Sequence, residues 1–220
     1  MAKTYHLQPL LDIAEICYRL GAGTAVLSPG SRCAPLAAGF TAHQGIKTFT
    51  FSDERAAAYV ALGMAQQQDS PVVLVCTSGT AAANYAPAVT EAFYQKGPLV
   101  LLTADRPPEW IDQQDGQAIR QQGLYGQHTA GAWQLPVITG HPDESWQVCR
   151  VLSEAIDVCR NGPVHINVPV REPFYPEAGV GIKFSQQLKV TPYHPALPEV
   201  PDTVWRLLRQ EWPQSGKVLL

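Results

Sequence analysis

Short, continuously apolar segments alternate with helical segments along most of this chain. In several of them the apolar residues occupy consecutive positions, which is typical of strands buried on both faces of a parallel sheet. Parallel neighbours must be joined by crossovers, which are almost always right-handed and usually contain a helix. The pattern predicts an α/β fold, a three-layer α/β/α domain with a mainly parallel six-stranded sheet. The expected strands are residues 24–27, 47–51, 72–76, 99–103, 134–138 and 164–168, and the expected helices are residues 7–20, 34–42, 54–67, 81–95 and 143–160.

The alternation stops after Pro169, where a segment rich in proline and glycine, residues 172–201, is typical of a linker. A short amphipathic helix is expected at residues 203–212, and the apolar residues 216–220 are expected to begin a further strand. We therefore expect one α/β domain over residues 1–175, followed over residues 176–220 by a linker and the start of a truncated central domain. This organisation predicts that the chain is a fragment.

Composition and charge argue against several classes of function. The 220 residues include 16 Lys and Arg against 19 Asp and Glu, a net charge of -3 without a basic run, so no nucleic-acid partner is expected. No segment is apolar enough for membrane insertion to be expected. The five cysteines form no Cys-x-x-Cys pair, which argues against a disulfide framework and against a zinc site. Together these features favour a cytoplasmic protein with reduced thiols.

Ligands of open parallel sheets bind beyond the carboxyl ends of the strands, so the turns that follow the expected strands form the candidate site. The first four of these turns are rich in hydroxyl, guanidinium and carboxylate groups. They are Ser28-Pro29-Gly30-Ser31-Arg32, Ser52-Asp53-Glu54-Arg55, Thr77-Ser78-Gly79-Thr80 and Ala104-Asp105-Arg106-Pro107-Pro108-Glu109.

Two of these turns begin helices, and each has two interpretations. The turn at residues 77–80 can offer backbone amides to an anion or a polar ligand, but it can equally be a helix cap. It matches neither a Walker loop nor a dinucleotide-binding fingerprint. Glu54 lies in a first helical turn, where a carboxylate commonly complements the helix dipole. Because Ser52 or Asp53 can already cap that helix, and small apolar residues follow, Glu54 is also a candidate functional group.

Arg32 and Arg106 are candidates for binding an acidic substrate. A guanidinium group presents a planar fork of donors that matches the two oxygens of a carboxylate. A solvated surface position would explain either arginine singly, but both follow strands at the same end of the predicted sheet. Arg120 is assigned to a solvated polar loop. His128 and His141 are interpreted as structural, because neither has a partner at metal-ligand spacing.

In sequence and in order, these turns resemble those of the 2-succinyl-5-enolpyruvyl-6-hydroxy-3-cyclohexene-1-carboxylate (SEPHCHC) synthase family (MenD), a family of thiamine-diphosphate enzymes. The similarity extends from about residue 8 to residue 175 and includes Gln117-Ala118-Ile119-Arg120-Gln121. The turns at residues 28–32 and 104–109 are the specific part of the resemblance. Glu54 and residues 77–79 are features shared more widely among thiamine-diphosphate enzymes.

The resemblance implies a transferase of menaquinone biosynthesis, in which thiamine diphosphate decarboxylates 2-oxoglutarate and the resulting carbanion is added to isochorismate. Glu54 would be catalytic, because it would hydrogen-bond N1′ of the aminopyrimidine and promote the imino form that removes the thiazolium C2 proton. The implied cofactor-binding residues are Pro29, Glu54, Thr77 and Gly79, and the implied isochorismate-binding residues are Ser31, Arg32, Arg106 and Gln117.

The chain departs from the family pattern in two ways. Gly116 stands where members of the family often have asparagine, which puts one substrate hydrogen bond in doubt. The Gly-Asp-Gly…Asn sequence that binds the diphosphate and Mg²⁺ or Mn²⁺ on a later domain is missing, so no metal ligand is expected here. The resemblance also implies a homo-oligomer, a dimer or a dimer of dimers. Our own hypothesis is that it pairs through the helices that follow Glu54 and Gly79. The isolated chain should therefore be inactive.

Two alternatives stay open. A different thiamine-diphosphate enzyme, such as a relative of acetolactate synthase or a 2-oxoacid decarboxylase, would keep the role of Glu54 but would not need Arg32 or Arg106. A non-catalytic α/β module that binds an anion at residues 77–80 would need none of the three.

Overall fold

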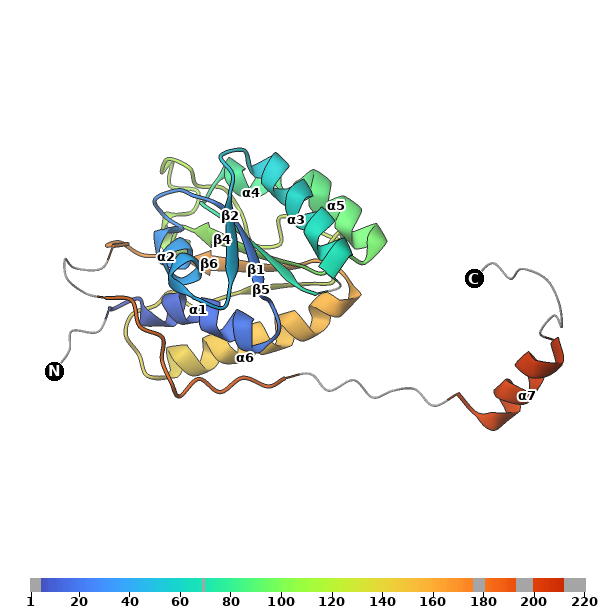
Figure 1. Cartoon of the computed structure of the whole chain (residues 1–220). Helices are drawn as coiled ribbons and strands as arrows, with labels where there is room; N and C mark the ends of the chain where they lie inside the picture. Colours follow the sequence, from blue (N-terminus) through green and yellow to red (C-terminus); the bar gives the residue numbers. More distant parts are fainter. Residues whose placement is uncertain (1–4, 69, 176–180, 193–199, 212–220) are drawn as a thin grey trace.

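The computed structural model describes residues 5–68, 70–175, 181–192 and 200–211. It contains a six-stranded sheet in which every neighbouring pair is parallel, in the order β2-β1-β3-β4-β6-β5 (Figure 1). The predicted α/β fold is confirmed. The strands are β1 (Thr24–Ser28), β2 (Lys47–Thr50), β3 (Val72–Cys76), β4 (Leu99–Asp105), β5 (Gly131–Gln134) and β6 (Val164–Pro169).

Helices cover both faces of this sheet (Figure 1). One face packs against α1 (Gln8–Arg19), α2 (Ala34–Ala42) and α6 (Asp143–Val158). The opposite face packs against α3 (Glu54–Gln68), α4 (Thr80–Asn84) and α5 (Ala86–Gln95). Two 3₁₀ turns, η1 (Pro108–Trp110) and η2 (Cys159–Asn161), lie in connections, and α7 (Asp202–Glu211) is separate from both layers. None of the described helices is both long and apolar enough to cross a membrane.

The central strand β3 shows why its apolar residues are continuous. Val73 and Val75 belong to the core beneath α1 and α6, whereas Val72, Leu74 and Cys76 belong to the core beneath α3 and α5. All five side chains are buried, because successive residues of a strand point to opposite faces. Burying one valine or leucine side chain contributes about 2 kcal/mol. A strand that is apolar on both faces thus stabilises two cores at once.

Two predicted elements were wrong in their bounds. The strand expected at residues 134–138 ends at Gln134 and begins at Gly131, because Pro136 has no backbone N–H to donate to the ladder. The helix expected at residues 81–95 is interrupted at Tyr85, two residues before Pro87 in the first turn of α5. Proline cannot make the hydrogen bond that would have joined the two helices.

The carboxyl-terminal part of the chain remains attached to the domain beyond the expected boundary at residue 175. Residues 181–192 lie along α1, where the buried carboxylate of Asp12 accepts hydrogen bonds from Ser185 N at 2.9 Å and Ser185 Oγ at 2.7 Å. Leu188 is buried in the core beneath α1 and α6. The domain boundary itself stays a prediction, and the strand expected at residues 216–220 lies outside the described residues.

Replacing Asp12 by alanine is expected to release this carboxyl-terminal segment. The change removes the acceptor of both hydrogen bonds from Ser185 and should lower the free energy of unfolding by about 2 kcal/mol. Trypsin should then cleave the variant faster than the wild type at Lys183 and Lys189. Mass spectrometry of the fragments measures the two cleavage rates. Asp157→Ala, at an exposed aspartate of α6, is the matched control and should leave the cleavage rate unchanged. Equal rates for both variants would contradict the role given to Asp12.

Candidate functional site

The turns that follow β1 and β3 touch each other at the carboxyl end of the sheet. Gly30 approaches Thr77 so closely that a Cβ atom at Gly30 would lie 2.5 Å from the Cβ atom of Thr77. Gly79, at φ +83°, carries the backbone of Gln117 above it, where a Cβ atom would lie 3.0 Å from the Gln117 Cα atom. Both glycines are therefore required by close approach, and the predicted convergence of the turns is confirmed.

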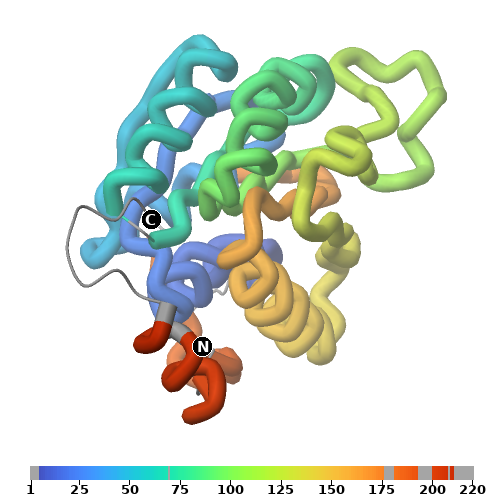
Figure 2. Tube along the Cα trace, turned by 90° about the vertical axis from the view of Figure 1, so that its right-hand side faces the viewer, coloured from blue at the N-terminus to red at the C-terminus, as the bar shows by residue number. Residues whose placement is uncertain are grey.

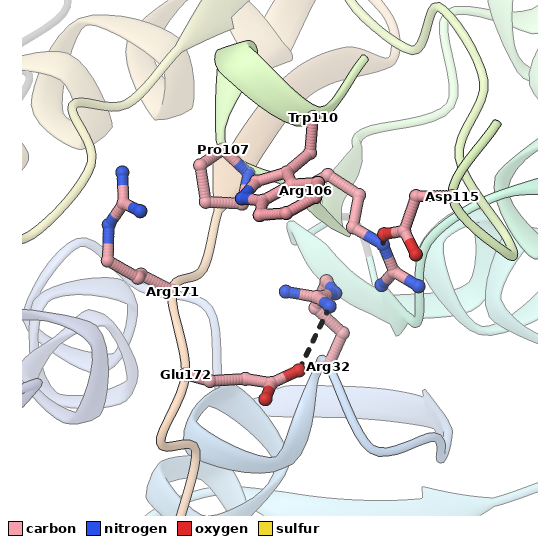
Figure 3. Close-up of a pocket in the computed structure, with 7 residues that line it drawn as sticks. All are labelled: Arg32, Arg106, Pro107, Trp110, Asp115, Arg171 and Glu172. Carbon is pink, nitrogen blue, oxygen red and sulfur yellow. Dashed lines mark hydrogen bonds and ion pairs between the residues drawn. The ribbon is translucent and has the colours of Figure 1, made fainter. Parts of the chain in front are cut away.

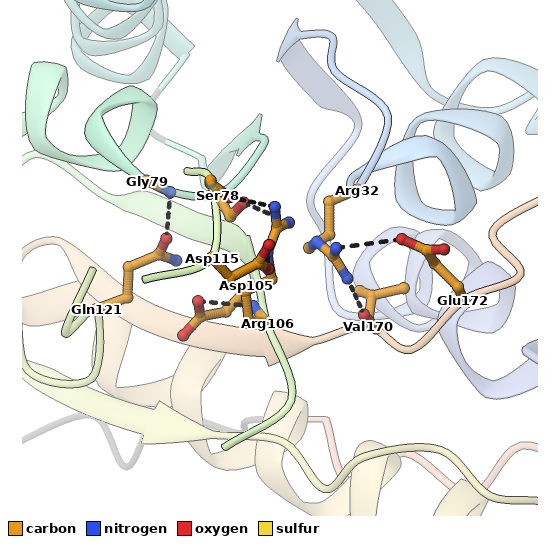
Figure 4. A network of polar contacts seen from close by, with 10 residues as sticks. Arg32, Ser78, Gly79, Asp105, Arg106, Asp115, Gln121, Val170 and Glu172 are labelled. Carbon is orange, nitrogen blue, oxygen red and sulfur yellow. Dashed lines mark hydrogen bonds and ion pairs between the residues drawn. The ribbon is translucent and has the colours of Figure 1, made fainter. Parts of the chain in front are cut away.

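Arg106 spreads its guanidinium group over three partners at this convergence (Figure 4). Its Nη1 atom donates to Ser78 Oγ at 3.3 Å, its Nε atom forms an ion pair with Asp115, and its Nη2 atom donates to the carbonyl of Gly116. The side chain of Arg106 is 12% exposed, and that of Asp115 is 36% exposed. The arginine thus links the end of β3 to the long connection between β4 and β5, which forms an outer loop in Figure 2.

Arg32 is buried, with its guanidinium group 4.7 Å from the centre of the Phe174 ring. Its Nη1 atom donates to the carbonyl of Val170 at 2.7 Å, and its Nη2 atom lies 3.5 Å from Glu172 Oε1. The buried Nε atom has no hydrogen-bond partner among the described residues. Burial and then the nearby charge of Arg106 lower the pKa of Arg32. An additional anion at this position would therefore stabilise the pair of arginines.

The two arginines line one cleft of about 460 Å³ (Figure 3). Figure 3 shows their side chains facing a common space, with Pro107 and Trp110 along one side and Glu172 along the other. Three arginines and two carboxylates line this cleft, so its lining carries a net positive charge. The cleft is completed by Asp115 and Arg171.

Glu54 lies half-buried at the start of α3. Asp53 caps α3: its Oδ1 atom accepts a hydrogen bond from Ala56 N at 2.7 Å. Asp53 is one of the two residues expected to cap this helix. Burial raises the pKa of the Cys76 thiol at the end of β3, and the charge of Glu54 adds to that rise. No hydrogen bond or ion pair joins the Glu54 carboxylate to another described residue, so it is available to a ligand.

The other predicted site residues are not among those that line the cleft. Ser31 and Gln117 are exposed, Pro29 is exposed beside Gly30, and Thr77 is buried against Gly30. The Gly79 N–H donates to Gln121 Oε1 at 2.7 Å, so this one amide of the turn is not free to bind an anion. Their roles as cofactor or substrate contacts stay predictions.

A buried polar network behind the site was not anticipated from the sequence. Asn167 Nδ2 donates to Asp105 Oδ2 at 2.7 Å, and Gln121 Nε2 donates to Asn167 Oδ1 at 3.0 Å. Burial raises the pKa of Asp105, although its hydrogen bonds from Asn167 and from Arg106 N oppose that rise. The signal that could have revealed it is an asparagine within a strand that is otherwise apolar on consecutive positions, because buried amides need partners.

His165 extends this network into the core. Its Nε2 atom lies 2.7 Å from Thr103 Oγ1, and the Thr103 hydroxyl lies 3.2 Å from Asn167 Oδ1. The Nδ1 atom has no partner among the residues that the structure describes, and the ring packs edge-on against Tyr125. Burial lowers the pKa of His165 to about 4, so the imidazole is neutral at physiological pH.

The remaining polar candidates lie outside the cleft, as expected. Arg120 is exposed and pairs with Asp112 at 2.9 Å. His128 packs against the rings of Phe93 and Tyr94. His141 is exposed and does not belong to a metal site, since the described residues contain no group of three or more His, Cys, Asp or Glu side chains suited to a metal ion.

Comparison with known proteins gives the site a context. Residues 12–124 match the family described as "Thiamine pyrophosphate enzyme, N-terminal TPP binding domain". The 2-succinyl-5-enolpyruvyl-6-hydroxy-3-cyclohexene-1-carboxylate synthase of Cytophaga hutchinsonii is 46% identical over 216 residues, which are 97% of this chain and 38% of that protein. The synthases of the same name from Porphyromonas gingivalis and Geobacillus kaustophilus are 39% and 43% identical, over 96% and 81% of this chain and 36% and 32% of their own lengths. The chain therefore spans about a third of the length of these curated relatives.

The low pKa of His165 predicts a pH-dependent loss of stability. As the pH falls below 6.5, an unfolded chain gains a proton at this residue, whereas the folded chain does not until about pH 4. The free energy of unfolding should therefore decrease across this window, by up to about 3 kcal/mol from His165. In His165→Gln, the loss measured by urea unfolding at pH 7 and pH 4 should be smaller by that amount. His141→Gln, at an exposed histidine, should keep the wild-type loss, and equal losses in all three proteins would contradict the assignment.

Proposed function

Because the chain belongs to the family of N-terminal TPP-binding domains of thiamine pyrophosphate enzymes, we propose that it is the aminopyrimidine-binding part of a SEPHCHC synthase. The complete enzyme would decarboxylate 2-oxoglutarate and transfer the remaining four-carbon unit to isochorismate, in menaquinone biosynthesis. The observation that carries the proposal is the pair of arginines, buried Arg32 and partly buried Arg106, that line one cleft at the carboxyl end of the sheet.

The surroundings of Glu54 fit thiamine diphosphate. Its carboxylate has no partner among the described residues, and the capping role that would otherwise explain it belongs to Asp53. When bound, thiamine diphosphate supplies the stabilisation of negative charge that decarboxylation of a 2-oxo acid needs. Glu54 would hold a proton at N1′ of the aminopyrimidine, acting as a general acid. Pro29, Thr77 and Gly79 would form the wall against which the aminopyrimidine rests.

The arginine pair suits a substrate with more than one carboxylate, and isochorismate has two. Arg32 has an unpartnered Nε atom, and the charge of Arg106 nearby makes an added anion favourable. Ser31 and Gln117 are exposed, and their side chains would donate to the remaining substrate oxygens. Gly116 offers no side chain for such a contact, so specificity would rest more heavily on the two arginines.

The remainder of the active site is proposed to lie outside this chain. Mg²⁺ or Mn²⁺ and the diphosphate would be bound by a later domain of a second subunit, so the chain would act within a homo-oligomer, a dimer or a dimer of dimers. The exposed side chains of Tyr59 on α3 and Tyr94 on α5 favour an interface on that helical layer. We also propose a cytoplasmic location, which agrees with five free, buried cysteines.

In the full-length protein, Glu54→Gln is expected to lower kcat by about 100-fold or more, since glutamine cannot supply the proton at N1′. Steady-state consumption of 2-oxoglutarate measures this. Asp53→Asn is the matched control, because asparagine caps helices as well as aspartate does and should retain activity within about twofold. Full activity of Glu54→Gln would leave only a helix-dipole role for this residue.

Arg32→Ala distinguishes a SEPHCHC synthase from other thiamine-diphosphate enzymes. Removing a charged hydrogen-bond donor to a carboxylate should raise the KM for isochorismate by about 30-fold. Arg150→Ala, at an exposed arginine of α6 paired with Glu154, should leave this KM unchanged, and thermal unfolding of both variants shows whether they are folded. An unchanged KM in a folded Arg32→Ala variant would argue for an enzyme with a different acceptor.

A further inference from the structure

Arg32 and Arg106 are each already paired with a carboxylate of the same chain. Arg106 pairs with Asp115, and Arg32 pairs more loosely with Glu172 at 3.5 Å. In both pairs the arginine is the less exposed partner. The side chain of Arg106 is 12% exposed against 36% for Asp115. The side chain of Arg32 is 9% exposed against 70% for Glu172. A carboxylate that arrives from solvent therefore meets an internal carboxylate at each fork (Figure 3).

The Nε and Nη2 edge of the Arg106 guanidinium group is occupied in this arrangement. Its Nε and Nη2 atoms are both bound by one turn, through Asp115 Oδ2 and the carbonyl of Gly116, while Nη1 donates to Ser78. A bidentate contact needs two adjacent donors of the guanidinium group. A substrate carboxylate can make that contact through Nε and Nη2 only if Asp115 gives up its position, because Nε has a single N–H group.

The segment that carries Asp115 is suited to such a movement. Asp112, Gln114 and Gln117 have φ values of 63°, 61° and 54°, in the left-handed region that residues with a Cβ atom rarely adopt. Such conformations cost of order 1 kcal/mol each and persist when surrounding contacts hold them. Here the holding contacts include the two from Arg106 to Asp115 and Gly116. Breaking them would allow this segment to relax.

We propose that Asp115 occupies the fork of Arg106 in place of a substrate carboxylate, and that substrate binding exchanges one carboxylate for the other. This inference rests on the proposed function, which makes the cleft the site of an acidic substrate. Asp115 neutralises a poorly solvated cation while the cleft is empty, and it sets a threshold that only a well-placed anion overcomes. The apparent affinity for the substrate is reduced by the fraction of molecules in which Asp115 is bound to Arg106.

Asp115→Asn in the full-length enzyme tests the exchange. Asparagine keeps the size of the side chain but replaces the ion pair by a weaker neutral contact, so the KM for isochorismate should fall by about five- to tenfold. The KM for 2-oxoglutarate should not change. Asp112→Asn is the matched control: it lies in the same segment, pairs with the exposed Arg120 and does not line the arginine cleft, so both KM values should remain those of the wild type.

Three other outcomes are informative. A KM for isochorismate that is unchanged or raised in Asp115→Asn overturns the exchange and makes Asp115 a residue that positions Arg106 for binding. A fall in the KM for 2-oxoglutarate alone supports displacement at Arg106 but overturns the assignment of isochorismate to that arginine. Absence of turnover of isochorismate by the wild-type enzyme overturns the proposed function and requires a measurement that is independent of activity.

Hydrogen exchange of residues 111–118 supplies that measurement. In the full-length protein without substrate, this segment should exchange at least about fivefold faster in Asp115→Asn than in the wild type, because the contact that holds its strained backbone is weakened. Asp112→Asn should exchange at the wild-type rate at residues 114–118. Equal protection of this segment in the wild type and Asp115→Asn would overturn the inference, whichever substrate the enzyme uses.

Discussion

The arrangement of the candidate site depends on the buried side chain of Asn167. An amide within a sheet that is apolar on both faces must be hydrogen-bonded, or it would cost several kcal/mol. Asn167 meets this requirement through Asp105 at the end of β4 and Gln121 in the following connection. Gln121 in turn accepts the hydrogen bond of the Gly79 amide. One buried amide therefore fixes the relative positions of the turns after β3 and β4.

This constraint divides the site into a fixed part and an adaptable part. The fixed part consists of buried backbone and side chains, from Gly30 packed on Thr77 to Arg106 N bound by Asp105. The adaptable part is the connection that carries Asp115, with its left-handed residues and more exposed side chains. Such a division suits an enzyme that must hold a cofactor rigidly and admit an acidic substrate, since pre-organised groups lose less free energy on binding.

The sequence predicted the sheet and the convergence of its turns because both follow from local rules: consecutive apolar residues mark buried strands, and parallel strands end at one edge. Arg32 and Arg106 could be paired on that basis alone. The interruption at Tyr85 and the early end of β5 could have been read from Pro87 and Pro136, whose missing N–H groups outweighed the apolar pattern. The pairing of Arg106 with Asp115 could not, because it depends on how an irregular connection folds back over the sheet.

The proposed function gives this chain Glu54 and the arginines as half of an active site for joining 2-oxoglutarate to isochorismate. The most direct test is mass spectrometry of the products formed by the full-length protein with thiamine diphosphate, Mg²⁺ and both substrates. We expect an adduct whose mass is the sum of the masses of the two substrates minus that of one carbon dioxide. It should form only when both substrates are present. Two results would contradict the proposed function. One is decarboxylation of 2-oxoglutarate at a rate that isochorismate does not change and that yields no adduct. The other is an adduct that forms with an added neutral acceptor but not with isochorismate.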